Sequence, residues 1–107
     1  MNMDPAKAKA EILKAVGNPV RITIVEALRH QDLCVRDLNR EVGVRQPTLS
    51  RHLTVLKKCG ILTERRAGLR VYHHLETPGI LQALNCAADV VKSHTRLRER
   101  LTRDLRP

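Results

Sequence analysis

With 107 residues the chain is long enough for one domain, whose modest core a partner subunit could complete. It has no Phe, no Trp and a single Tyr, which nearly excludes a surface that stacks aromatic rings on single-stranded nucleic acid. The 20 Lys and Arg against 11 Asp and Glu give a net charge of +9, which favours a polyanionic partner. No apolar run approaches the ~20 residues of a membrane span, and the polar start lacks the apolar segment of a signal peptide, so we expect a cytoplasmic protein whose three cysteines are thiols.

Two helices are predicted before residue 30. Each begins with a capping side chain followed by proline: Asp4-Pro5 for a helix over residues 4–16, and Asn18-Pro19 for a helix from Val20 to about Leu28. Gly17 separates them, because glycine readily ends a helix. The apolar residues expected to face the core are Ile12, Leu13 and Val16 in the first helix and Ile22, Val25 and Leu28 in the second.

Residues 35–60 predict two short helices around a tight turn. In the first, Val35, Leu38 and Val42 follow helical spacing, and Gly43 is expected to end the helix in the left-handed conformation. The second runs from Gln46 to Lys58 and has a proline in its first turn, where a missing N–H costs nothing. Its apolar stripe is Leu49, Leu53 and Leu56, and Gly60 closes it.

The opposite face of the second helix carries side chains suited to DNA. Amide and guanidinium groups can pair with base edges in the major groove, while hydroxyl groups and a helix N-terminus suit phosphate oxygens. We therefore predict a helix-turn-helix motif with residues 46–58 as its recognition helix. The residues expected to bind DNA are Gln46, Thr48, Ser50, Arg51 and His52 in the major groove, with Lys57 on a phosphate.

From residue 61 to residue 75 the pattern changes to that of strands. Two extended runs, 61–66 and 69–75, flank a turn at Ala67-Gly68. A basic hairpin directly after a recognition helix is typical of the wing of a winged helix-turn-helix, which can reach a flanking phosphate or a narrow minor groove. The arginines expected to do so are Arg65, Arg66 and Arg70. Between Arg45 and His73 there are seven basic residues and one acidic residue, Glu64: Arg45, Arg51, Lys57, Lys58, Arg65, Arg66 and Arg70.

A last helix is expected to begin at Thr77-Pro78, with an apolar stripe too long for this small core to absorb. Its natural partner is the same helix of a second subunit, and a two-fold dimer would match a palindromic DNA site. The stripe comprises Ile80, Leu81, Leu84, Ala88, Val91, Leu97 and Leu101. The predicted fold is therefore mostly α with a small β-hairpin: one winged helix-turn-helix domain over residues 1–107, in the order α-α-α-α-β-β-α, that dimerises through the terminal helices at residues 4–16 and 78–103.

The segment LCVRDLNREVGVRQPTLSRHLTVLKKCGILTERRAGLRVYHHLE resembles the core of the ArsR/SmtB family of bacterial winged-helix repressors. Its runs QPTLSRHLTVLKKCGIL and RRAGLRVYHHL match the family pattern nearly residue for residue, and GNPVRITIVEAL upstream extends the resemblance. The resemblance implies a homodimer that occupies an operator in double-stranded DNA and leaves it when an inducer binds. Inducers in the family are metals, metalloids, or oxidants and sulfur species that act on thiols, and the resemblance does not choose among them.

The resemblance also points to an inducer site at the cysteines. A family effector site uses a Cys-x-Cys pair at the start of the first motif helix; Cys34 matches its first position, but Arg36 stands at the second. A single thiolate cannot form the three-sulfur site that arsenite prefers, so a soft-metal site would have to recruit Cys86, with Cys59 as a third candidate. Cys34 also lies near a helix N-cap, where it could be a reactive thiolate in a redox or persulfide switch with Cys86. Both alternatives remain open, and no cofactor is otherwise required.

Other sites and functions have less support in the sequence. A tetrahedral zinc site between paired last helices would have only Asp89 and His94, which are five residues apart and do not share a helix face. The alternative function is a protein-interaction module on the same scaffold, against which the basic wing argues. An enzyme is not expected, because no nucleophile–base pair, acid pair or phosphate loop is present.

Overall fold

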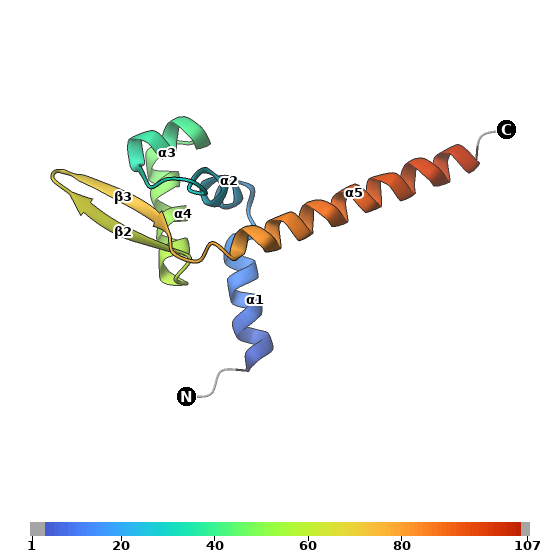
Figure 1. The fold of residues 1–107 in the computed structure, drawn as a ribbon, viewed down its shortest axis with the longest axis horizontal. Helices are drawn as coiled ribbons and strands as arrows, with labels where there is room; N and C mark the ends of the chain where they lie inside the picture. The colour runs from blue at the N-terminus through green and yellow to red at the C-terminus, as the bar shows by residue number, and fades with distance from the viewer. Residues whose placement is uncertain (1–3, 106–107) are drawn as a thin grey trace.

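The computed structural model, which describes residues 4–105, contains five helices and a small antiparallel sheet in that range (Figure 1). The elements follow the predicted order, with one short strand added. They are α1 (Pro5–Val16), α2 (Pro19–Ala27), β1 (Leu33–Cys34), α3 (Val35–Val42), α4 (Gln46–Lys58), β2 (Leu62–Ala67), β3 (Arg70–Leu75) and α5 (Ile80–Asp104). Helices α2 to α4 and the sheet form a body, from which α5 projects as a long single helix (Figure 1).

The helix ends follow from the capping residues in the sequence. The Asp4 carboxylate accepts the Ala6 N–H at 2.9 Å, and the Asn18 side chain accepts the N–H groups of Val20 and Arg21. Gly43 has φ 72°, the left-handed value that ends α3. The predicted bounds of α3 and α4 are therefore confirmed.

The core is aliphatic and lies between α2, α3, α4 and the sheet. Leu49, Leu53 and Leu56 are buried as predicted, together with Leu38 and Leu62. Two predictions for the first two helices were wrong. Leu13 is 59% exposed, because only one side of α1 meets the body, and Ile24, absent from the predicted set, is fully buried, because α2 is packed against α1, α3, α4 and α5.

The sheet has the strand order β1-β3-β2. Strand β1 was not predicted, since two residues are too few for a periodic signal; it pairs Leu33 with His73. The hairpin turn lies one residue later than predicted, at Gly68-Leu69, because Ala67 already pairs with Arg70. Gly68 has φ 65°, which a tight hairpin turn requires at its first position.

Helix α5 begins at Ile80, slightly after the predicted Thr77-Pro78, and the Thr77 carbonyl accepts the Ile80 N–H. Ile80, Leu81 and Leu84 pack against the core of their own protomer. Beyond them the apolar side chains are exposed, Val90 by 67%, Leu97 by 51% and Leu101 by 54%. The first part of the predicted stripe therefore packs against the core of its own protomer, and only the remaining side chains lack a packing partner among the described residues.

Candidate nucleic-acid interface

The exposed face of α4 lies opposite its buried leucines. Ser50 and Arg51 are exposed, and the Arg51 guanidinium donates to the Thr48 hydroxyl at 3.4 Å. Thr54 and Lys58 follow Arg51 at i+3 and i+7, so they share its face. They were not among the predicted DNA-binding residues, although the same helical spacing that identified the leucine stripe could have found them.

One flank of α4 is tied to α2 through His52. Arg21 Nε donates to His52 Nδ1 at 3.0 Å, while the Arg21 guanidinium also reaches the Ala15 carbonyl. Burial, with the charges of Arg21 and Arg51, lowers the pKa of His52 and keeps the ring neutral at pH 7. Because Nδ1 accepts a hydrogen bond, the ring proton is on Nε2, which can donate to DNA.

The other flank of α4 faces the wing. Lys57 forms an ion pair with Glu64 of β2, and the hydrogen bond from Lys57 lowers the pKa of that carboxyl. His73 of β3, the register partner of Glu64, is only 2% exposed, and neither of its ring nitrogens has a hydrogen-bond partner in the described structure. Burial lowers the pKa of His73. Lys57 therefore links α4 to the wing, and its positive charge is largely offset by Glu64.

The three predicted wing arginines differ in their surroundings. Arg65 donates to the Asp32 carboxylate at 3.3 and 3.4 Å and lies 5.0 Å from the centre of the Tyr72 ring. His74 also binds Asp32, at 2.7 Å, and these contacts, with that of His74 the largest, lower the pKa of Asp32. Arg66 and Arg70 are exposed and form no ion pair in the described structure. Of the three wing arginines, Arg66 and Arg70 are therefore the ones available to bind a phosphate.

A cavity of about 450 Å³ separates the start of α3 from the start of α4 and from β3. Its lining brings the predicted residues Gln46 and Arg70 together with Cys34. The full lining is Cys34, Val35, Arg36, Asn39, Gln46, Arg70 and Val71. Predicted DNA-binding and inducer residues thus share one site.

The chain resembles bacterial transcription repressors in sequence and in structure. Residues 18–64 match the family model described as bacterial regulatory protein, arsR family. The transcriptional repressor SmtB of Mycobacterium tuberculosis is 43% identical over 68 residues, which are 64% of this chain and 50% of SmtB. The crystal structure of the transcriptional repressor BigR from Xylella fastidiosa has 32% identity and a TM-score of 0.72, and the match covers 79% of this chain and 87% of BigR. The chain belongs to the ArsR family.

The fold agrees with this assignment. A homodimeric winged helix-turn-helix domain from Mycobacterium bovis, described as a possible ArsR-family regulator, shares the fold at a TM-score of 0.72 and 24% identity, over 84% of this chain and 83% of that one. The match to SmtB spans only half of that repressor's length. Members of the ArsR family are DNA-binding regulators and not enzymes, as the sequence predicted. Within residues 4–105 no helix is both long enough and apolar enough to cross a membrane.

The three cysteines lie on different elements of the described structure, and none of them belongs to a group of three metal-ligating side chains within one protomer. All three are free thiols: Cys34 is buried at the start of α3, Cys59 is half-buried after α4, and Cys86 is exposed on α5. The Cys34 thiol donates to Asp37, and the Cys59 thiol donates to the Leu56 carbonyl. Among residues 4–105 of one protomer, no three His, Cys, Asp or Glu side chains lie where they could hold a metal ion. A three-sulfur arsenite site therefore does not fit a single protomer.

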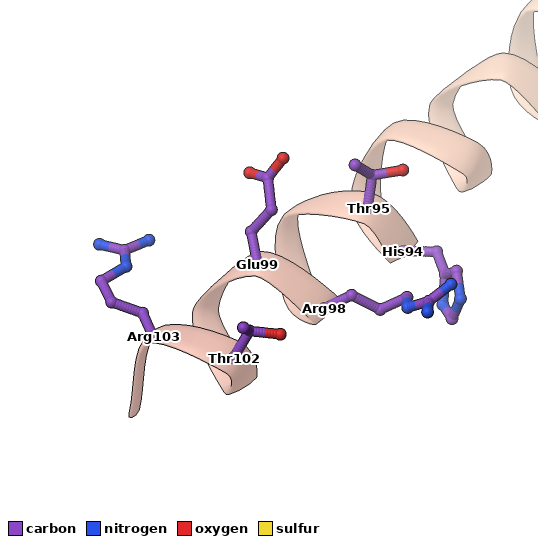
Figure 2. Close-up of a pocket in the computed structure, with 6 residues that line it drawn as sticks. All are labelled: His94, Thr95, Arg98, Glu99, Thr102 and Arg103. Atoms are coloured by element: carbon purple, nitrogen blue, oxygen red, sulfur yellow. The ribbon is translucent and has the colours of Figure 1, made fainter. Parts of the chain in front are cut away.

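A groove of about 540 Å³ lies on the projecting part of α5. It is lined by His94, Thr95, Arg98, Glu99, Thr102 and Arg103. Figure 2 shows that all six belong to one helix, with Arg98 extending beside His94 while Glu99 points elsewhere. Because no second element among residues 4–105 forms its other wall, this groove cannot enclose a small ligand as a binding pocket does.

Proposed function

We propose that the chain is a homodimeric, sequence-specific repressor that binds a palindromic operator and is released when an inducer acts on its cysteines. The exposed face of α4, with Arg51 at its centre, would read bases, and Arg66 and Arg70 would bind flanking phosphates. The observation that carries the proposal is a set of exposed cations on α4 and the wing that form no ion pair with a carboxylate of the described residues: Arg51, Lys58, Arg66 and Arg70. A bacterial repressor works beside the chromosome, so we place the protein in the cytoplasm.

The terminal helices support dimerisation. An apolar groove of about 180 Å³ lies between α1, α2 and α5, and it is lined by Leu13, Val16, Gly17, Ile22, Ile80, Ala83, Leu84 and Ala87. It is continuous along α5 with the exposed Val90, Leu97 and Leu101. A second copy of the chain would cover this surface, and two copies related by a two-fold axis would present two recognition helices to a palindrome.

The spacing along α5 supports helix-to-helix pairing. Side chains alternately three and four residues apart form one seam: Ile80, Ala83, Ala87, Val90, His94, Leu97 and Leu101. Ile80 packs against its own protomer, and beyond it the seam has small side chains first and large ones last. If two copies ran antiparallel, Leu101 would lie opposite Ala83 and Leu97 opposite Ala87, so these layers would have the same volume.

For the inducer, we propose thiol chemistry at Cys34. The support is the position of this thiol on the cavity shared with Gln46 and Arg70. A thiophilic metal or metalloid would need thiolates from both protomers, with Cys86 or Cys59 as further ligands. Release of operator DNA by the reduced protein, challenged with arsenite, cadmium and a persulfide donor in turn, would separate these inducers. The responses should be lost in Cys34→Ser, and a metal response should also be lost in Cys86→Ser.

The DNA-binding proposal is tested by the salt dependence of operator affinity. If the cationic face binds phosphates, affinity for DNA should fall steeply as salt rises, while the preference for one palindrome is retained. Arg66→Ala should lower the slope of log K against log salt by about 0.9, the value for one phosphate contact. Arg65→Ala is the matched control, because Asp32 already pairs with that guanidinium. A flat salt dependence, or no preference among sequences, would favour the protein-interaction module instead.

A further inference from the structure

We propose that the cavity between α3, α4 and β3 holds one phosphate of the operator backbone, and that the charge at position 34 controls its occupancy. The inference rests on the proposed DNA binding and adds Arg36 and Asn39 to the DNA-binding surface. Nothing in the sequence pattern singled out either residue for that role. The cavity that they line with Gln46 and Arg70 has a volume of about 450 Å³ and is open to solvent.

The lining has the chemistry of an anion site. It contains two guanidinium groups, Arg36 on α3 and Arg70 on β3, and no acidic residue. Neither arginine forms an ion pair with a carboxylate of the described residues; the nearby Asp37 pairs with Arg40 on the same helix. Guanidinium groups bind phosphate oxygens through paired N–H donors, so a single phosphate could bridge α3 and the wing.

Two amide side chains complete the lining. Gln46 is the first residue of α4, where free backbone N–H groups favour anions. Asn39 has a buried side-chain oxygen without a hydrogen-bond partner. Asn39 also lines the cavity, so its amide NH₂ group could donate to an anion bound there. The source of the phosphate is DNA rather than a free ion, because α4 and the wing are the two elements proposed to straddle the backbone.

Cys34 forms a neutral wall of this cavity. Its side chain is almost fully buried, the residue is the N-cap of α3, and its thiol donates to Asp37 Oδ2 at 3.3 Å. A negative charge at this position would lie beside the bound phosphate and repel it across a poorly screened distance. Inducer chemistry that leaves Cys34 anionic could therefore release DNA directly, without a movement of the helices.

The test compares Cys34→Asp with Cys34→Asn. The two side chains have the same shape and are equally good helix N-caps, so they differ at the cavity only in charge. Cys34→Asp should bind the operator about tenfold more weakly than Cys34→Asn at low salt, with the difference shrinking as salt rises. Equal affinities of the two variants across the salt range would overturn the role of position 34.

A second pair keeps the test valid if Cys34→Asp folds poorly, which its thermal unfolding would reveal. Arg36→Ala should weaken operator binding several-fold and lower the salt slope by about 0.9, and Arg36→Lys should restore part of both. Arg40→Ala is the control, since this arginine is exposed on the same helix but does not line the cavity. If Arg36→Ala behaves like Arg40→Ala, there is no phosphate in the cavity.

Two further outcomes distinguish the possible failures. If the wild type binds no DNA with sequence preference, the proposed function itself is wrong and the cavity has no backbone phosphate to hold. If inorganic phosphate raises the melting temperature of the wild type but not of Arg36→Ala, relative to chloride at equal ionic strength, while operator binding is the same for both proteins, the cavity serves a free phosphate. That result would overturn the DNA assignment.

Discussion

The body of the molecule and its terminal helices both carry aliphatic side chains, but these are buried in the body and exposed on the terminal helices. In the body, Ile24, Leu38 and Leu49 are completely buried by contacts within one protomer. On the terminal helices, Leu13, Leu97 and Leu101 are more than half exposed, although the helices themselves are regular. The difference teaches that one chain can complete the winged helix-turn-helix, whereas the exposed apolar surface of α1 and α5 is the one that the proposed dimer would cover.

The largest effect should come from the body. Leu49→Ala removes a fully buried side chain near the start of α4 and leaves a cavity, which should lower the free energy of unfolding by about 2–5 kcal/mol. Denaturant unfolding of the purified protein would measure the loss. Leu69→Ala is the control, since Leu69 is fully exposed at the wing tip and should change stability by no more than about 0.5 kcal/mol. A small effect of Leu49→Ala would mean that the core is not the closed unit described above.

Substitutions on the terminal helices should affect dimerisation and leave the stability of the body unchanged. Replacing Leu97 and Leu101 together by Ser should leave the body folded but abolish the dimer, which sedimentation at several protein concentrations would show. Because the two half-sites would then be bound independently, operator affinity should fall by roughly 10²-fold or more. Leu105→Ser is the matched control, as that leucine is exposed beyond the end of α5. A double variant that stays dimeric would exclude this seam as the interface.

The exposed face of α4 is the second surface that we propose to be covered by a partner, which in this case is DNA. Arg51→Ala should weaken operator binding by ~1–3 kcal/mol if the guanidinium reads a guanine, and should relax the preference for that base pair. Binding titrations with operators altered one base pair at a time would locate the position read by Arg51. An unchanged affinity for the cognate site would remove Arg51 from base reading.

The sequence predicted where helices begin and end better than it predicted which of their side chains are buried. The limits of α3 and α4 followed from local signals, the proline near the start of α4 and the glycine after α3, which act within a few residues. The burial of Ile24 and the exposure of Leu13 did not follow, because both depend on which neighbours pack against α1 and α2. Helical periodicity shows that a residue lies on an apolar face, but it does not show whether that face has a partner.

At the candidate site, too, the sequence could not predict which side chains contact one another. The sequence identified the basic residues of α4 and the wing but could not rank them, because the carboxylates that pair with Lys57 and Arg65 come from Glu64 and Asp32. Asp32 is 33 residues from Arg65 and is brought to it only by the sheet. Cys34 and Arg70 likewise meet across the cavity only because α3 and β3 pack together. Side chains that are distant in sequence carry no local signal of their contact.

Like the Asn39 oxygen, the side chain of His73 departs from this contrast, because it is buried in the body and yet lacks a hydrogen-bond partner in the described structure. His73 is buried without a hydrogen-bond partner for either ring nitrogen, and Glu64 and Lys57 are the charged groups that act on it. Its pKa in the folded protein is lowered, so the unfolded chain binds a proton more readily than the folded one. Stability is therefore present above the unfolded pKa of about 6.5 and is lost as the pH falls below it.

The smallest predicted effect is the pH dependence of stability that follows from the lowered pKa of His73. The free energy of unfolding should decrease between about pH 7.5 and pH 5, by no more than about 1.4 kcal/mol per pH unit for each histidine involved. His73→Gln should make the dependence shallower, and the remainder should come from His52, whose pKa is lowered too. His30→Gln, a change at an exposed histidine, is the control. The paired carboxyls of Asp32 and Glu64 also have lowered pKa values, but their contribution is lost only at more acidic pH, so it does not overlap this range. If the free energy of unfolding of His73→Gln depends on pH as steeply as that of the wild type, the His73 ring has a hydrogen-bond partner in solution. His73 would then not be an exception to the contrast between the body and the terminal helices.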